Sequence, residues 1–339
     1  MHTDEASLRS LKIRGIVGAG LVASWLGACG GVAESPEHTP PSDVVAACAE
    51  NARIACELSD ACQGGSSTLL YGSEETCAAR TALSCEHRAT SPGAGYGSAE
   101  IKTCIANQQA QTCEEWVGTL TPGCGFVGTR ANGTNCEYGS QCASGFCDAY
   151  RYYTDGNVCG VCANPPVEGQ ACNSSCGGDG TVRCEHDGTA GRCVRLGAMG
   201  QACGATAHCA TGLNCAIAAN ATIGQCLPAT ANEGDPCDDE VGPLCDYRRR
   251  IYCNALTATC VMAQNAGLGE ICGSLADGGV AQCANSVCQP AGASAHNGKC
   301  IAFLADGAAC TYGPGSIPCT PPALCAYGQC RIVGGELCD

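Results

Sequence analysis

Lysine, aromatic side chains and long apolar runs are all scarce in this chain of 339 residues. Lysine occurs only at Lys12, Lys102 and Lys299, and the formal net charge is −15, which disfavours nucleic acid and anionic lipid headgroups as partners. Aromatic residues make up 4%, and the apolar 45% counts Cys and Ala, so the large side chains that fill a single core are missing. No run after residue 28 is apolar for long enough to cross a bilayer.

Cysteine takes the place of the missing core residues. The chain has 35 cysteines together with 47 Gly and 15 Pro. Such a count excludes an ordinary protein of a reducing compartment, because disulfides form and persist mainly after export. We therefore expect cross-links to stabilise the fold. The odd number predicts that one cysteine has a different fate.

The first 28 residues have the features of an export signal. Arg9, Lys12 and Arg14 form a basic start, and an apolar run of about 13 residues follows, too short for a permanent membrane helix. The run ends in Leu26-Gly27-Ala28-Cys29. This ending resembles the lipobox of bacterial lipoproteins, which implies cleavage before Cys29 and lipid attachment to it. The alternative is an ordinary signal peptide with Cys29 in a disulfide.

The resemblance also implies a location. Gly30, rather than Asp, follows the cysteine, and in that family this favours the outer membrane or cell surface over the inner membrane. Residues 29–43 then read as a lipidated cysteine and a flexible tether, because they lack apolar periodicity and contain Pro36, Pro40 and Pro41. An extracellular location remains open.

Residues 44–128 predict a helical cysteine-rich domain. Ser42 or Asp43 can cap a first helix, Ser73 a second, and Ser98 a third over 99–117. Cysteines eight residues apart share one broad helix face, so two antiparallel helices can be stapled in pairs. The eight cysteines of this region form a closed even set, namely Cys48, Cys56, Cys62, Cys77, Cys85, Cys104, Cys113 and Cys124. We expect Trp116 to pack in the small core.

The remainder of the chain repeats. Six segments open with G-x-x-C, and their opening cysteines recur every 31 to 38 residues: Cys136, Cys172, Cys203, Cys237, Cys272 and Cys310. Five of them close with G-x-C, whereas the fourth closes with Ala258-Thr259-Cys260. The predicted repeats are 129–164, 165–196, 197–229, 230–263, 264–303 and 304–339. Each has four module cysteines and room for two disulfides, and glycines beside the cysteines suit turns with positive φ.

The sequence thus predicts a small disulfide-rich fold: a short α-helical cysteine-stapled domain followed by a tandem array of six loop/β-ribbon four-cysteine modules. The spacing resembles the cysteine-rich repeats of secreted myxobacterial proteins, which are classed by similarity to the N-terminal cysteine-rich domain of Dickkopf proteins. The helical domain ahead of the repeats resembles the usual partner domain in that bacterial group. No receptor-contact residue of the Dickkopf proteins matches, so Wnt antagonism is not implied.

Motifs that carry chemistry are weak. Cys159-Gly160-Val161-Cys162 has the spacing of a redox pair but no surrounding βαβ pattern. The six His are scattered and no second C-x-x-C occurs, so we expect no metal, no cofactor and no catalytic residue. The acidic pairs Glu114-Glu115 and Asp238-Asp239-Glu240 are interpreted as solvated charges. The one basic cluster, at 248–250, is interpreted as an exposed loop or, alternatively, a local contact patch.

Three functions remain. The first is a non-enzymatic cell-surface lipoprotein that binds a protein or glycan, with Phe146, Tyr150, Tyr152 and Tyr153 as the candidate binding patch. The second is a structural or protective envelope component, and the third an enzyme of unrecognised type. Cys159 and Cys338 have no module partner. They can bridge each other, bridge neighbouring modules, or bind another chain.

Overall fold

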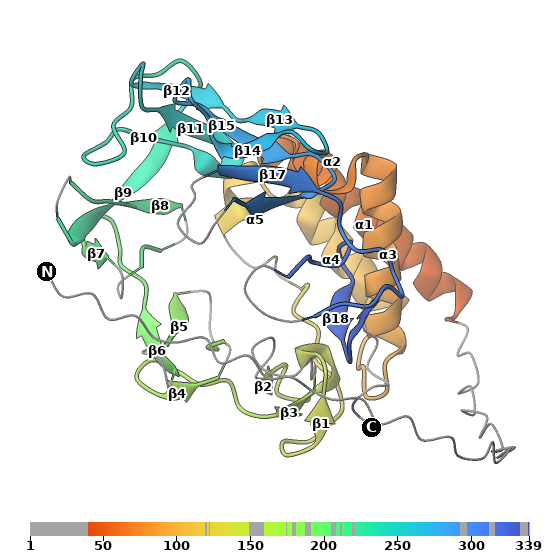
Figure 1. The fold of residues 1–339 in the computed structure, drawn as a ribbon. Helices are drawn as coiled ribbons and strands as arrows, with labels where there is room; N and C mark the ends of the chain where they lie inside the picture. Colours follow the sequence, from red (N-terminus) through yellow and green to blue (C-terminus); the bar gives the residue numbers. More distant parts are fainter. Residues whose placement is uncertain are drawn as a thin grey trace, which may run out of the picture. The chain divides into compact units, whose positions relative to one another are not determined.

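A computed structural model describes most of the chain after residue 39. The described residues are 40–118, 121, 123–148, 159–173, 175–177, 181–186, 191–204, 208–210, 212–218, 221–291, 297–311, 316–332 and 338. The expected signal peptide, Cys29 and most of the tether lie outside them. Within these residues five helices come first (Figure 1), namely α1 Ser42–Cys62, α2 Ser66–Tyr71, α3 Glu74–Thr90, α4 Ser98–Ala110 and α5 Cys113–Gly118.

Two disulfides staple α1 to α3. Cys48 bonds Cys85 and Cys56 bonds Cys77, so the expectation of twin staples between two antiparallel helices is confirmed. Ile101 of α4 is fully buried in the core that these helices share. The set of eight cysteines is closed by two further disulfides, Cys62–Cys113 and Cys104–Cys124.

The helix ends follow local capping chemistry. The Ser73 hydroxyl accepts a hydrogen bond from the Thr76 N–H and caps α3, as expected. The expected side-chain cap of α1 is wrong, because Pro41 occupies the N-cap and Ser42 is already helical. The expected helix over 99–117 is also wrong, since it breaks at residues 111–112.

Thr112 explains that break. Its backbone N–H donates to the Glu115 carboxylate at 2.8 Å, and its hydroxyl accepts from the Glu115 N–H at 3.3 Å. This reciprocal capping box starts α5 as a separate helix. Cys113 is therefore exposed on the first turn of α5, not buried along α4.

Short strands follow the helices and form six small sheets among the described residues. The orders are β1-β3-β2, β4-β6-β5, β10-β9-β7 with β8 also on β9, β11-β12, β13-β15-β14-β17-β16, and β18-β19. All pairs are antiparallel except β9 with β10 and β13 with β15. Two sheets are the expected two-stranded ribbons, whereas the other four have three to five strands.

The bounds of the strands are β1 Asn135–Cys136, β2 Cys147–Asp148, β3 Gly160–Cys162, β4 Ala171–Cys172, β5 Val182–His186, β6 Gly191–Arg195, β7 Ala202–Gly204, β8 Leu213–Ala216, β9 Ile223–Ala231, β10 Leu244–Cys245, β11 Ile251–Asn254, β12 Thr259–Met262, β13 Gln264–Ala266, β14 Ile271–Ser274, β15 Val280–Cys283, β16 Val287–Pro290, β17 Asn297–Ile301, β18 Leu324–Ala326 and β19 Gln329–Arg331. Two 3-10 turns, η1 Gly139–Gln141 and η2 Tyr247–Arg249, lie between them.

The same turn opens each of the six cysteine groups. In the first, Gly133 has φ +89°, and a Cβ placed there would meet no atom within 4 Å, so backbone conformation and not space requires glycine. Its N–H donates to the Cys162 carbonyl at 2.8 Å. Equivalent bonds of 2.8 Å join the other opening glycines to their closing cysteines: Gly169–Cys193, Gly200–Cys226, Gly234–Cys260, Gly269–Cys300 and Gly307–Cys330. The expectation of positive-φ glycines beside cysteines is confirmed at these six positions.

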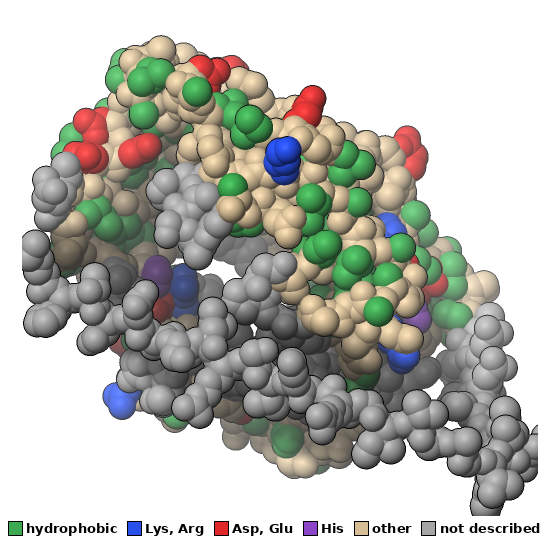
Figure 2. Space-filling model, in the orientation of Figure 1, with side chains coloured by type: hydrophobic (Ala, Val, Ile, Leu, Met, Phe, Trp, Pro, Cys, Tyr) green, Lys and Arg blue, Asp and Glu red, His purple; other side chains and the backbone are tan. Residues whose placement is uncertain are grey.

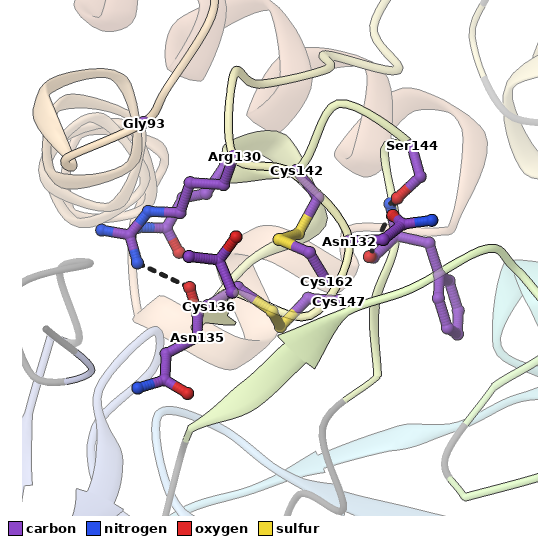
Figure 3. The surroundings of a disulfide bond; sticks show 12 residues. Gly93, Arg130, Asn132, Asn135, Cys136, Cys142, Ser144, Cys147 and Cys162 are labelled. Carbon is purple, nitrogen blue, oxygen red and sulfur yellow. Dashed lines mark hydrogen bonds between the residues drawn. A yellow bond between two sulfur atoms is a disulfide. The ribbon is translucent and has the colours of Figure 1, made fainter.

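The four cysteines of each group pair crosswise. In the first group Cys136 bonds Cys147 and Cys142 bonds Cys162, which joins first to third and second to fourth (Figure 3). All six groups have this order. The third and fourth cysteines lie directly opposite each other on neighbouring strands, as Cys147 lies opposite Cys162, yet they bond elsewhere. The two disulfides therefore pack together as a small buried core.

Cys159 and Cys338 bond each other, which is one of the three alternatives that the sequence leaves open. This disulfide spans 179 residues and ties the first cysteine group to the end of the chain. Seventeen disulfides in all use every cysteine of the described residues. Only Cys29 lies outside them.

Two arginines join the helices to the strand region. Arg80 of α3 pairs with Asp306 at 2.5 Å and donates to the carbonyls of Thr320 and Pro321. Arg130 donates to the Pro92 carbonyl and to the Asn135 carbonyl (Figure 3). In the part of the chain that the structure describes, no helix combines the length and apolar character needed to cross a membrane.

Candidate functional site

The binding patch expected from the sequence lies almost entirely outside the described residues. Of its four aromatic side chains the structure places only Phe146, which is half-buried. Tyr150, Tyr152 and Tyr153 lie outside. Trp116 is half-buried and lines a cavity of about 350 Å³ between α1, α2 and α3. It does not belong to the core cluster around Ile101, but it lies beside residues of α1 and α3 such as Cys56 and Cys77.

A better candidate lies at residues 239–280, where the fourth and fifth cysteine groups meet. Two cavities flank the segment 239–244, one of about 500 Å³ and one of about 440 Å³. Small side chains such as Ala202 and Ala216 line much of the larger one. The smaller one is lined by two tyrosines, Tyr247 and Tyr252, and by Asp239. We call the smaller cavity the tyrosine groove.

Apolar residues form the base of the tyrosine groove. Leu244 of β10 and Ile251 of β11 line it and are 4% and 2% exposed. Leu275, which directly follows β14, also lines it. An apolar base with a few polar groups around it is the usual composition of a ligand site.

Tyr252 is held in place by a chain of hydrogen bonds. Gln282 donates from Nε2 to the Tyr252 hydroxyl at 2.8 Å, and its Oε1 accepts from Arg250 Nε at 2.7 Å. Burial raises the pKa of Tyr252. Tyr247, on η2, is 43% exposed and lies at the groove surface.

Arg250 is the anchor of this chain. It is 8% exposed, and its guanidinium also donates to the Gly64 carbonyl at 3.1 Å and to Asn265 Oδ1. Burial lowers the pKa of Arg250, but the group remains charged because the pKa of a free guanidinium is so high. The interpretation of residues 248–250 as an exposed loop is therefore wrong for Arg250. Its fork of donors finds acceptors from three distant parts of the chain.

Gly278 also lines the tyrosine groove. Gly278 has φ +80°, and a Cβ at this position would lie 2.5 Å from Asn254 Oδ1 and 3.0 Å from the Leu256 backbone N. The same Asn254 donates from Nδ2 to the Asp277 carbonyl at 3.0 Å. The turn at 275–279 and the β11–β12 turn thus pack against each other with no space for a side chain at 278.

Asp239 stands in an unfavourable position for a charge. Loss of surrounding water and the neighbouring Asp238 both raise the pKa of Asp239. Asp238 is itself held by the turn, since its Oδ1 accepts from the N–H groups of Glu240 and Val241. Asp239 is exposed, as the sequence predicts, but it also lines the groove, which the interpretation as solvated charge does not include.

Clusters of three cysteine sulfurs within 4.8 Å recur along the chain, as at Cys237, Cys245 and Cys260. Each of these sulfurs belongs to a disulfide, and metals bind cysteine as the thiolate. The clusters follow from the crosswise pairing that packs two disulfides together.

Sequence reasoning missed the tyrosine groove. One signal did mark the place: the fourth repeat is the one that departs from the G-x-C closing pattern. Two of the ten tyrosines also stand within this repeat, on both sides of the basic cluster at 248–250. Figure 2 shows one face of the molecule, on which acidic side chains are scattered and basic ones are few. Comparison with known proteins gives no significant match to a family model, to a curated protein or to a solved structure.

Proposed function

We propose that this chain is an exported, non-enzymatic binding protein, anchored by a lipid on Cys29 to the outer membrane or surface of a bacterium. Its body is a helical cysteine-stapled domain at 44–128 and a tandem array of six four-cysteine modules. The partner is a protein or glycan and not a nucleic acid, and the body contacts the membrane only through the lipid. The resemblance to myxobacterial cysteine-rich repeat lipoproteins supports the same proposal.

The observation that carries the proposal is the tyrosine groove within a cross-linked frame. Its walls come from segments that are each closed by two disulfides, including Cys237–Cys253 and Cys272–Cys288. A site on such walls loses little conformational entropy when a ligand binds, and this favours recognition. The disulfides also suit a protein that works outside the cell.

The anchor is tested by Cys29→Ser. The exported parent is expected to partition with outer membranes, and the variant is expected to be released in soluble form. Equal partition of both proteins would rule out the lipid anchor. The binding role is tested by photo-crosslinking on the native cell surface, with the crosslinker placed at Tyr247. A specific partner is expected there, and its absence would contradict the binding role.

A structural or protective role is the second candidate, and the Cys159–Cys338 disulfide favours it. A link over 179 residues restrains the chain end and resists proteolysis without any ligand. Such a component is expected to form higher-order assemblies on the envelope. Size measurements of the protein extracted in mild detergent separate the two roles, because a binding protein is expected to remain monomeric without its partner.

A further inference from the structure

We propose that the tyrosine groove recognises a cationic side chain, arginine or lysine, presented by a partner polypeptide. Tyr247 and Tyr252 supply aromatic faces, and Asp239 supplies the carboxylate. The inference rests on the proposed binding function and narrows its ligand.

The first support is the carboxylate. Within the described residues, no hydrogen bond or ion pair engages the Asp239 side chain, and both influences on its pKa act against its ionised form. A cation from outside would reverse that effect, since an opposite charge nearby favours the carboxylate. An anionic ligand would add to the repulsion between the Asp238 and Asp239 carboxylates, and a neutral ligand would leave that repulsion unchanged.

The second support is that neighbouring cations are already engaged. Arg248 pairs with Asp246 through two contacts, of 2.8 and 3.3 Å. Arg250 is buried and directed to Gln282, Asn265 and the Gly64 carbonyl. These two cations therefore have acceptors other than Asp239, so neither of them forms an ion pair with its carboxylate.

The third support is the pair of tyrosines. An arginine or lysine binds over an aromatic face when the ring is held within about 6 Å. The Tyr252 ring is held by the bond from Gln282 to its hydroxyl, so it is oriented before a ligand arrives. Tyr247 is exposed at the surface of the groove and accessible to a side chain that enters.

The fourth support is the charge of the whole chain. At −15, with three lysines, it attracts cationic partners over a distance and speeds their encounter. The neighbouring cavity carries Ile223 and Val241, which are 68% and 62% exposed. A basic residue beside an apolar one in an extended partner segment matches the two cavities on either side of residues 239–241.

The test uses the exported, fully oxidised chain and two small probes. N-acetyl-arginine amide carries the cation, and N-acetyl-citrulline amide has nearly the same shape without charge. Ligand-detected NMR titrations are expected to show binding of the arginine probe, and binding of the citrulline probe at least about fivefold weaker. Equal binding of the two probes, or binding of N-acetylglucosamine in place of the arginine probe, would overturn the inference.

Variants locate the probe. Asp239→Asn and Tyr247→Ala are each expected to weaken arginine binding by about fivefold or more. Glu233→Gln is the matched control, because it removes the same charge from an exposed position that does not line the groove. Equal weakening by Asp239→Asn and Glu233→Gln would mean that only general electrostatics acts. If the protein captures a surface partner whose binding Asp239→Asn leaves unchanged, the inference fails while the proposed binding function stands.

Discussion

Replacing Arg250 with alanine removes the buried guanidinium that ties the fourth cysteine group to the α1–α2 loop and to the fifth group. The backbone is little affected by the change itself, because Arg250 already has φ +63° and alanine has a similar cost in that conformation. The variant therefore reports on the side chain. Three acceptors lose a close donor, namely the Gly64 carbonyl, Asn265 Oδ1 and Gln282 Oε1, and the Ala263 carbonyl loses a longer contact of 3.5 Å.

The magnitude follows from those three bonds. A hydrogen bond from a charged group contributes about 1.5–3 kcal/mol, and a buried acceptor left unpaired costs about 1–3 kcal/mol. Part of the loss is recovered, because the guanidinium itself no longer has to be desolvated. We expect a net loss of about 3–4 kcal/mol in the free energy of opening this region. Arg250→Lys keeps the charge but not the fork, so we expect a loss of about 2 kcal/mol.

Hydrogen exchange measured by mass spectrometry at pH 7 reads this opening locally, with all disulfides intact. Peptides covering residues 263–283 are expected to exchange about 150- to 900-fold faster in Arg250→Ala, since each 1.36 kcal/mol is about a factor of ten. Arg195→Ala is the control, because Arg195 pairs with Glu168 on the surface, with side chains 61% and 49% exposed, and such pairs contribute little. If both variants change exchange by the same small factor, the assignment of Arg250 as a buried anchor is refuted.

Two further predictions concern a glycine and an ion pair. Gly278→Ala and Gly269→Ala both place alanine at a φ near +80°, but only Gly278 lacks space for a Cβ. The Gly278 variant should therefore be less stable than the Gly269 variant by about 1–3 kcal/mol, and it should unfold at a lower urea concentration. Arg80 lowers the pKa of Asp306, so the ion pair stabilises the fold above the unfolded pKa of 3.8 and is lost as pH falls through the lower folded value. The stability difference between the parent and Asp306→Asn, measured in urea, should therefore be about 1 kcal/mol at pH 6. It should shrink as the pH falls below 3.8, and a difference that stays constant with pH would contradict the ion pair.

Features set by neighbouring residues were predictable. The cap at Ser73 and the opening turn at Gly133 follow from two or three adjacent residues, and the structure has both. The disulfide-rich character of the fold, with helices followed by short strands, was also predictable. The break at Thr112 has a local signal, the Thr-x-x-Glu capping box, but the prediction of one helix over 99–117 rested on apolar periodicity and did not include it.

Features that join distant segments were not predictable. Four cysteines allow three pairings, and only the three-dimensional arrangement selects first with third and second with fourth. The same holds for the Cys159–Cys338 link over 179 residues. Burial of Arg250 depends on acceptors at residues 64, 265 and 282, which the local sequence does not reveal. Its position beside two other arginines instead predicted an exposed charge. The tyrosine groove was missed for the same reason.

The disulfide pairing of the exported protein tests the central claim most directly. Digestion without reductant, followed by mass spectrometry, identifies which cysteine-containing peptides are joined. We predict first-to-third and second-to-fourth pairing in all six groups, the Cys159–Cys338 link, and a lipid on Cys29. Pairing of neighbouring cysteines within the groups, or free thiols among them, would contradict the cross-linked frame on which the proposed function depends.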